Sequence, residues 1–222
     1  MPAEMASAVL WDFDGTLMKT EQIWIAVGKE FLAEYGAKID LSQTNNFVGA
    51  SFSVIAEATS ELIGGQLSPQ EVKEEIENRL VAAFESAELI YQPGAKQLLA
   101  QLRQLGIPCG LVSSSPRKVL LSAVSRLPEN SFELVISGDD VETAKPDPEP
   151  YLLAIKQLEV AADKIIILED SLPGIQSARA SGAVVVAIPD QIKIESAPRQ
   201  IILDSLADIN VETLMQLWRT NR

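Results

Sequence analysis

Short apolar runs alternate with helical patterns along most of the chain. The apolar runs cover residues 6–13, 108–112, 134–136, 164–168 and 184–188. Apolar residues recur with helical spacing over residues 94–105, 116–126, 148–158, 173–181 and 211–218. Buried runs of strand length that alternate with amphipathic helices are typical of a parallel sheet covered by helices. The pattern therefore predicts an α/β fold, a Rossmann-like doubly wound parallel sheet.

One segment departs from this alternation. From about residue 20 to residue 88 the pattern is helical only, over residues 23–35, 51–63 and 68–87, and the last of these opens with a capping-box sequence, Ser68-Pro69-Gln70-Glu71. A helical block inserted after the first strand is expected to form a separate small cap domain, 20–88, with linkers near residues 18–22 and 85–93. The α/β core domain then comprises residues 1–19 and 89–222.

The charge balance limits the partners. The chain of 222 residues has 18 Lys and Arg against 31 Asp and Glu, a formal net charge of −13. This balance argues against nucleic acid and anionic membrane surfaces, because both require clustered cations. No apolar run approaches the ~20 residues of a membrane span, and Glu4 stands where a secretory signal carries Lys or Arg. We expect a cytoplasmic protein, a monomer or a weak homo-oligomer, that acts on a small molecule.

Two counts exclude whole chemistries. The chain has no His and a single Cys. Without imidazole there is no Ser-His-Asp triad, no Cys-His pair and no His-bound zinc. A lone Cys109 forms neither an internal disulfide nor a cysteine zinc site. Catalysis by this chain therefore rests on carboxylates, Lys, Ser and Thr, and a hard metal bound by oxygen.

Polar residues follow the apolar runs at the positions where an open parallel sheet binds ligands, outside the carboxyl ends of its strands. These residues are Asp12, Asp14, Thr16, Ser113, Ser114, Lys145, Glu169 and Asp170. Each alone has an ordinary structural interpretation, as a turn, a helix cap or a solvated loop. Their joint position at neighbouring strand ends favours one shared site.

The composition of this set predicts its ligand. Carboxylates gathered at one edge of a sheet repel each other unless a cation lies among them. Mg²⁺ fits, because it prefers oxygen ligands, uses few carboxylates and keeps places for water and phosphate. Lys145 offers a positive charge to the same phosphate, and Thr16, Ser113 and Ser114 offer neutral donors. The sequence therefore predicts a site for a phosphoryl group.

Four segments carry a resemblance to a known family. They are Asp12-Phe13-Asp14-Gly15-Thr16-Leu17, Leu111-Val112-Ser113-Ser114-Ser115, Ala144-Lys145-Pro146-Asp147-Pro148 and Leu168-Glu169-Asp170-Ser171. In this order they resemble the four motifs of the haloacid dehalogenase-like hydrolases. The chain is most similar to the β-phosphoglucomutase-like branch, which has a small helical cap inserted after the first motif.

The resemblance implies a mechanism. Asp12 is then the nucleophile that forms an aspartyl-phosphate, and Asp14 first protonates the leaving oxygen and later activates water. The side chains of Asp12 and Asp170 and the backbone carbonyl of Asp14 are assigned to Mg²⁺, and Glu169 to orienting its waters. Ser113 and Lys145 are assigned to the phosphate. The expected activity is that of a Mg²⁺-dependent phosphatase acting on a small phosphorylated metabolite.

The chain departs from this branch at the hinge and in the cap. Lys19-Thr20-Glu21 stands where the branch has Asp-Ser-Glu, and Phe52 and Trp24 stand where the sugar-phosphate mutase has an Arg and a His. A phosphosugar mutase is therefore the less favoured alternative. Specificity is expected from the cap residues Trp24, Phe47, Ser51 and Phe52, although aromatic residues of helices more often serve packing.

Two further alternatives use the same scaffold. Dehalogenation of a haloacid needs neither Asp14 nor Mg²⁺, so the presence of Asp14 and Asp170 argues against it. A non-catalytic regulatory protein that binds a phosphorylated ligand is the other alternative, and the presence of every motif residue needed for turnover argues against that.

Overall fold

The computed structural model of this chain describes residues 4–38, 51–189 and 193–222. Within them lies a six-stranded sheet whose strands run in the order β3-β2-β1-β4-β5-β6, all parallel. The strands are β1 (Ala8–Trp11), β2 (Cys109–Val112), β3 (Leu134–Ile136), β4 (Ile165–Glu169), β5 (Val184–Ala187) and β6 (Gln200–Ile202). The predicted doubly wound parallel sheet is confirmed.

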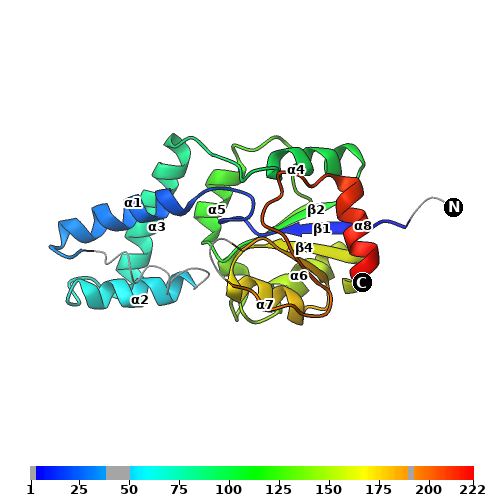
Figure 1. The fold of residues 1–222 in the computed structure, drawn as a ribbon. Helices are drawn as coiled ribbons and strands as arrows, with labels where there is room; N and C mark the ends of the chain where they lie inside the picture. Colours follow the sequence, from blue (N-terminus) through cyan, green and yellow to red (C-terminus); the bar gives the residue numbers. More distant parts are fainter. Residues whose placement is uncertain (1–3, 39–50, 190–192) are drawn as a thin grey trace.

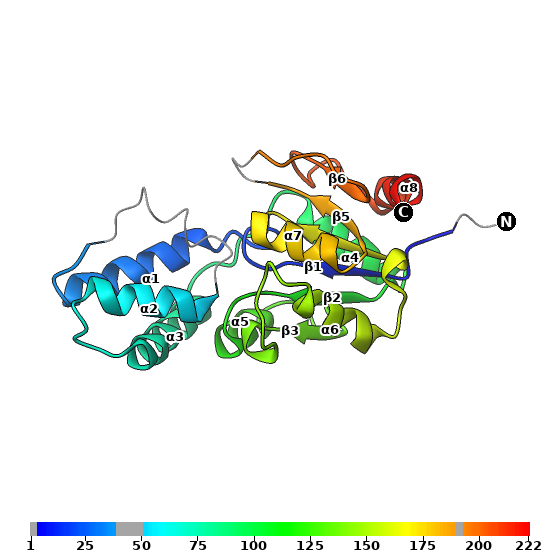
Figure 2. The ribbon, with the colours of Figure 1, turned by 90° about the horizontal axis from the view of Figure 1, so that it is seen from below.

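Alternate residues of the strands face opposite layers of helices, as the two-residue period of a strand requires. In β1, Val9 and Trp11 face one apolar layer, whereas Ala8 and Leu10 face the other. Both layers are buried, so the strands read as continuous apolar runs. The helices of the core are α4 (Ala95–Gln104), α5 (Arg117–Val124), α6 (Glu149–Leu158), α7 (Leu172–Ala180) and α8 (Val211–Asn221), which enclose the sheet in Figures 1 and 2.

The sequence pattern did not predict β6. This strand pairs with β5 through Val185 and Gln200, and Ile201 is buried. Its apolar run is very short, and an irregular stretch precedes it rather than a helical pattern. Pairing with the edge of β5 therefore produces a strand where the local sequence gives little signal. Two short 3-10 helices, η2 (Gly138–Asp140) and η3 (Ala162–Lys164), were not predicted either.

Three helices lie to one side of the sheet (Figure 1). They are α1 (Glu21–Glu34), α2 (Phe52–Leu62) and α3 (Pro69–Ser86), and α3 packs against both of the others. The predicted capping box begins α3: Ser68 Oγ accepts a hydrogen bond from the Glu71 backbone N–H, and the Glu71 carboxylate accepts one from the Ser68 N–H. No strand lies among the described residues between 20 and 88.

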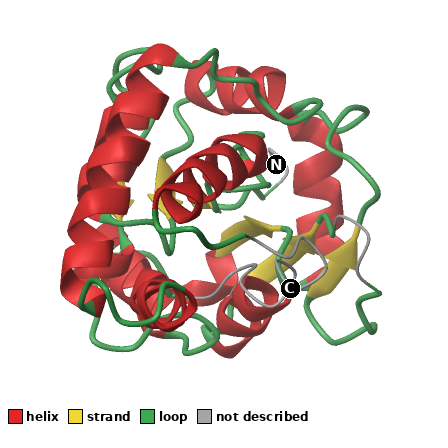
Figure 3. Cartoon of the chain, turned by 90° about the vertical axis from the view of Figure 1, so that its left-hand side faces the viewer, coloured by secondary structure: helices red, strands yellow, loops and turns green. Residues whose placement is uncertain are grey.

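The three helices are joined to the sheet by the chain segments before α1 and after α3, which pair with each other, and by the packing of α3. The Lys19 N–H donates to Ile90 O at 2.8 Å, and the Gln92 N–H donates to Leu17 O at 3.0 Å, so the outgoing and returning chains pair as a short bridge. Helix α3 also packs against α5. Figure 3 shows the chain from the side of α1–α3. Among the described residues, no helix has both the length and the apolar character needed to cross a membrane.

Candidate active site

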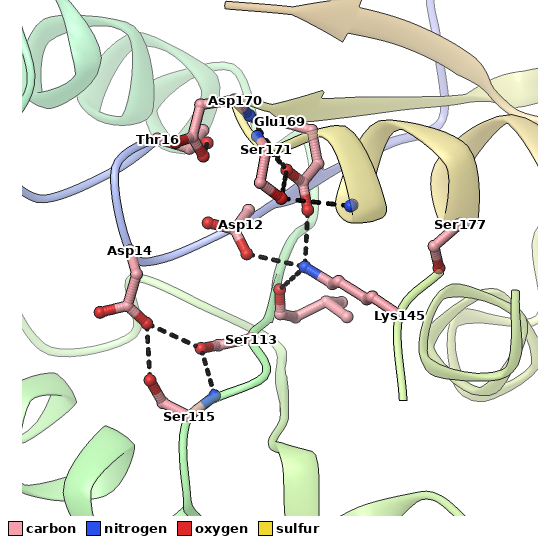
Figure 4. Close-up of polar contacts among 12 residues, drawn as sticks. Asp12, Asp14, Thr16, Ser113, Ser115, Lys145, Glu169, Asp170, Ser171 and Ser177 are labelled. Carbon is pink, nitrogen blue, oxygen red and sulfur yellow. Dashed lines mark hydrogen bonds and ion pairs between the residues drawn. The ribbon is translucent and has the colours of Figure 1, made fainter. Parts of the chain in front are cut away.

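Seven of the eight polar residues predicted from the sequence lie together at the carboxyl edge of the sheet, namely Asp12, Asp14, Thr16, Ser113, Lys145, Glu169 and Asp170 (Figure 4). Among the described residues, no side-chain contact places Ser114 with them. Asp12 follows β1, Ser113 follows β2, and Glu169 ends β4. Strands β2 and β4 flank β1 on its two sides, so the chain leaves β1 at the point where the strand order reverses. That point is where doubly wound sheets bind their ligands.

The Lys145 ammonium lies between two carboxylates. Its Nζ donates to Asp12 Oδ1 and to Glu169 Oε1, each at 2.7 Å, and to the carbonyl of Val112 at 3.1 Å. Burial alone would lower the pKa of Lys145, but the charges of Asp12 and Glu169 outweigh burial and hold this pKa above its usual value. The positive charge of Lys145 thus offsets part of the negative charge of the gathered acids.

An ammonium has three N–H donors and no acceptor. The three acceptors named above therefore use all of the hydrogen-bonding capacity of Lys145. A phosphoryl group that Lys145 binds, as the sequence predicts, therefore takes the place of one of these acceptors. Val112 O makes the longest of the three contacts. It is also the only uncharged acceptor of the three, so a phosphate that replaces it leaves both ion pairs of Lys145 intact.

Glu169 is fully buried and is held on both oxygens. Oε1 accepts from Lys145 Nζ and from the Tyr151 hydroxyl, the latter at 2.9 Å. Oε2 accepts from the backbone N–H groups of Asp170 and Ser171 and from the Ser171 hydroxyl, at 3.0 to 3.2 Å. A side chain at Gly174 would overlap this carboxylate, because a Cβ there would lie 1.7 Å from Oε1. Helix α7 therefore needs a glycine in its first turn for Glu169 to fit.

Asp14 lies apart from this cluster and is held by four donors. Oδ1 accepts from the Thr20 hydroxyl at 2.7 Å and from the Trp24 indole N–H at 3.1 Å. Oδ2 accepts from the hydroxyls of Ser113 at 3.1 Å and Ser115 at 2.6 Å. Two donors thus come from the end of β2 and two from the start of α1, so both sides of the hinge orient Asp14.

Asp170 lies against the loop after β1. The Thr16 hydroxyl donates to Asp170 Oδ1 at 2.7 Å. Gly15 has φ of +92°, and a Cβ there would lie 2.2 Å from Asp170 Oδ2, so only glycine fits this turn. Burial, followed by the charge of Glu169, raises the pKa of Asp170 to about 7. Burial likewise raises the pKa of Asp12 well above its usual value, against the opposing effect of Lys145.

The donor set fits a magnesium ion. Asp12, Glu169 and Asp170 each offer an oxygen, and these oxygens lie within 4.8 Å of one another. Glu169 has five donors already, whereas Oδ2 of Asp12 and Oδ2 of Asp170 accept no hydrogen bond from the described residues. Two free carboxylate oxygens in a buried acidic pocket suit Mg²⁺, which uses one or two carboxylates and fills its other places with water and phosphate.

The cap residues predicted from the sequence occupy different environments. The Trp24 ring packs edge-on against Phe52, with ring centroids 5.8 Å apart, and its N–H reaches Asp14. Phe52 is buried as the first residue of α2, and Ser51 is the N-cap residue of that helix, although its side chain makes no capping hydrogen bond. Phe47 lies outside the described residues.

Several residues that hold the predicted acids were not themselves predicted as site residues, among them Ser171 beside Glu169. Ser115 and Thr20 hold Asp14, and Tyr151 holds Glu169. Ser115 stands in the serine run that the motif already includes, so the run itself was a usable signal. Thr20 reads as an ordinary helix cap, but it makes no capping bond, and its hydroxyl donates to Asp14. Tyr151 occupies an apolar position of a helical pattern, which gives no indication of a polar role.

The fold and the site define a class of α/β enzymes that place two aspartates after the first strand, with a buried lysine and further acids from neighbouring strand ends. The family model of the haloacid dehalogenase-like hydrolases matches residues 9–188. The chain belongs to this family. The recognition made from the four sequence motifs is therefore confirmed.

Relatives and solved structures agree with this assignment. The N-acetylmuramic acid 6-phosphate phosphatase of Pseudomonas aeruginosa is 30% identical over 187 residues, 82% of this chain and 80% of that protein. The bifunctional riboflavin kinase/FMN phosphatase of Arabidopsis thaliana is 28% identical over 218 residues, 96% of this chain, but the chain spans only 55% of that relative. The fold is that of the β-phosphoglucomutase from Clostridium difficile, with a TM-score of 0.83, 21% identity, and coverage of 97% of this chain and 98% of that one.

Proposed function

We propose that this hydrolase is a Mg²⁺-dependent phosphatase that cleaves a small phosphorylated metabolite, such as a sugar phosphate, through an aspartyl-phosphate. The observation that carries the proposal is that two aspartates of one loop are held separately, Asp12 by Lys145 at 2.7 Å and Asp14 by four donors of its own. The names of the two relatives described above support the reaction class, because each contains the word phosphatase.

In the first step, a carboxylate oxygen of Asp12 attacks phosphorus and the bond to the leaving oxygen breaks. Asp14 enters this step protonated, with the Ser113 or Ser115 hydroxyl turned to accept from it, and gives this proton to the leaving oxygen, so a neutral alcohol departs. In the second step, water attacks phosphorus and the acyl-phosphate bond breaks, which restores the Asp12 carboxylate. Asp14 accepts the proton of the attacking water. Such transfers depend mainly on in-line positioning and on charge neutralisation.

The side chains of Asp12 and Asp170, together with the backbone carbonyl of Asp14, are the groups that would hold Mg²⁺. The bound ion would neutralise charge on the phosphoryl group. Lys145, Ser113, Ser114 and Thr16 are the proposed phosphate ligands, and Glu169 serves this set by fixing Lys145. Local attraction of this kind is needed, because a net charge of −13 repels an anionic substrate at long range.

Residues 20–88 serve in this proposal as a cap domain that excludes water and selects the substrate. Trp24 lies within hydrogen-bond distance of Asp14, and Asp14 meets the leaving group. The Trp24 ring and Phe52, which packs against it, are therefore placed to contact the part of the substrate that leaves. Phe47 and Ser51 are proposed for the same surface on sequence grounds.

The test is an assay of the purified chain with 4-nitrophenyl phosphate and a panel of phosphorylated metabolites, with Mg²⁺ and with a chelator in its place. We expect hydrolysis that requires Mg²⁺. A chain that releases halide from a 2-haloacid without Mg²⁺ would instead be a dehalogenase, and one that binds the panel compounds without turnover would be a regulatory protein.

A further inference from the structure

Tyr151 is a buried residue of this site to which the proposed reaction assigns no role. It lies in the first turn of α6, six residues after Lys145, and its side chain is fully buried. Its hydroxyl donates to Glu169 Oε1 at 2.9 Å. The centre of its ring lies 4.9 Å from Lys145 Nζ. One tyrosine therefore touches both members of the Lys145–Glu169 pair, through different parts of its side chain.

These contacts close a cage around the ammonium. Lys145 Nζ has Asp12, Glu169 and Val112 as acceptors, and the ring of Tyr151 faces it as well. A cation over an aromatic face is attracted by the negative charge of that face, the more so when water is excluded. With its acceptors and the ring in place, Lys145 has little freedom to leave its position beside Asp12.

The hydroxyl and the ring make separate contributions. Glu169 Oε1 accepts both Lys145 and Tyr151. Without the hydroxyl, the ammonium is the sole partner of that oxygen among the described residues. Glu169 Oε1 then attracts the ammonium more strongly, and we expect the ammonium to shift from Asp12 toward Glu169. A phenol buried without a partner is itself costly, so its pairing with Glu169 also fixes the orientation of the ring under the ammonium.

We propose that Tyr151 is a positioning residue that holds the Lys145 ammonium between Asp12 and Glu169, so that Asp12 faces the phosphoryl group in one orientation. Tyr151 touches neither substrate nor metal in this arrangement and acts through Lys145. Its effect on turnover rests on the proposed phosphatase function, whereas its effect on Lys145 does not.

The first test observes the ammonium directly. A caged ammonium exchanges its protons with water slowly, whereas an exposed one exchanges too fast to be observed. In a ¹H–¹⁵N spectrum of the labelled chain at neutral pH, without Mg²⁺, we expect a Lys145 ammonium signal, assigned by its loss in Lys145→Met. The signal should change its chemical shift and broaden in Tyr151→Phe, which keeps the ring and removes only the hydroxyl.

The matched control is Tyr91→Phe. Tyr91 also has an ammonium over its ring, that of Lys96 at 5.7 Å, but it lies in the segment that returns from α3 and makes no contact with Glu169. The Lys145 signal should persist in this control. Absence of the signal from the parent chain, or its unchanged presence in Tyr151→Phe, would overturn the proposal.

A second measurement needs no tyrosine variant and covers the case in which Tyr151→Phe does not fold. The chain has three tyrosines, so 3-fluorotyrosine labelling gives three ¹⁹F signals. Replacing Lys145 by Met should shift the Tyr151 signal and leave those of Tyr35 and Tyr91 in place. An unmoved Tyr151 signal would contradict the contact between ring and ammonium.

The kinetic test applies to the Mg²⁺-loaded chain. In Tyr151→Phe we expect kcat to fall about tenfold, with KM within about twofold, because a misplaced reacting group lowers the rate more than the binding. Tyr91→Phe should match the parent. If the parent itself shows no Mg²⁺-dependent turnover, the proposed function fails and the spectra still test Tyr151. If the parent turns over and Tyr151→Phe has the same kcat, the positioning role is wrong.

Discussion

The ring of Phe13, which stands between Asp12 and Asp14, packs against the ring of Phe84 near the end of α3, with centroids 6.2 Å apart. Both side chains are fully buried. The loop that carries the two aspartates therefore packs directly against a helix of the inserted segment. The inserted helices and the sheet share one continuous apolar cluster at this point.

This contact predicts a large loss of stability on truncation of Phe84. Phe84→Ala should lower the free energy of unfolding by about 3 to 5 kcal/mol, because it removes a buried aromatic ring and leaves a cavity. Urea denaturation followed by circular dichroism measures the change. Leu105→Ala, at an exposed position, is the control and should change stability by less than about 0.5 kcal/mol. Equal effects of the two substitutions would show that Phe84 does not support the loop.

Asp12→Asn should abolish phosphate release while the fold persists. The amide oxygen of Asn can still accept the Lys145 hydrogen bond, but the neutral amide cannot act as the nucleophile. Phosphate release and circular dichroism are the measurements. Asp208→Asn, which neutralises an exposed acid, should match the parent in both. Turnover by the Asp12 variant would contradict the aspartyl-phosphate mechanism.

Asp14→Asn should still form the phosphoenzyme from an aryl phosphate, at a reduced rate, but turn over poorly. An aryl oxide leaves without a proton, whereas water needs a base to take its proton. The fold tolerates the change, because the hydroxyls of Ser113 and Ser115 can rotate to accept from the new amide. Rapid-quench measurement should show a burst followed by slow release. A steady-state rate equal to the parent's would exclude Asp14 as the acid and base.

Trp24→Phe tests the indole contact. The variant keeps an aromatic ring against Phe52 and removes the single N–H that reaches Asp14. We expect kcat to fall roughly tenfold, the equivalent of about 1.4 kcal/mol for one hydrogen bond to a charged group. The matched control is Trp218→Phe, which also loses one indole hydrogen bond, to Asp163 O at 3.0 Å, far along the chain in α8. Equal kcat values for the two variants would mean that the contact does not assist Asp14.

The raised pKa of Asp170 predicts how Mg²⁺ stabilises the chain. In the metal-free fold this pKa is about 7, above the value near 3.9 of an unfolded chain. The folded state therefore binds the proton more tightly, and this group's contribution to stability is full below about pH 4 and is lost as pH rises through 7. Because Mg²⁺ competes with that proton, the rise in Tm that Mg²⁺ causes should be larger at pH 8 than at pH 5.5.

Thermal unfolding with Mg²⁺ and with a chelator, at both pH values, measures this difference. Asp170→Asn is the control: it should lose most of the Mg²⁺-dependent shift and much of the pH dependence of the metal-free Tm. A Mg²⁺-dependent shift of the same size at both pH values would contradict competition between the ion and the proton.

Much of the site was accessible from the sequence, because polar residues after buried strands have to meet at one edge of a parallel sheet. Asp12, Ser113 and Glu169 follow this rule. The partners of those residues were less accessible. Lys145 is predicted to bind the phosphate, but its contacts with Asp12 and Glu169 are visible only in the fold. Trp24 is predicted from the sequence as a cap residue for substrate specificity, but its hydrogen bond to Asp14 is visible only in the fold.

The local sequence accounts for the strands, the helix caps and the positions of the candidate acids, because periodicity and capping act over a few residues. The pairing of donors with acceptors arises only on folding. Tyr151 and Glu169 are 18 residues apart in the chain, and Thr16 and Asp170 are 154 apart. Which hydroxyl donates to which carboxylate depends on how the helices pack against the sheet. Residue type and spacing along the chain do not determine that packing locally, so only the tertiary structure decides these pairs.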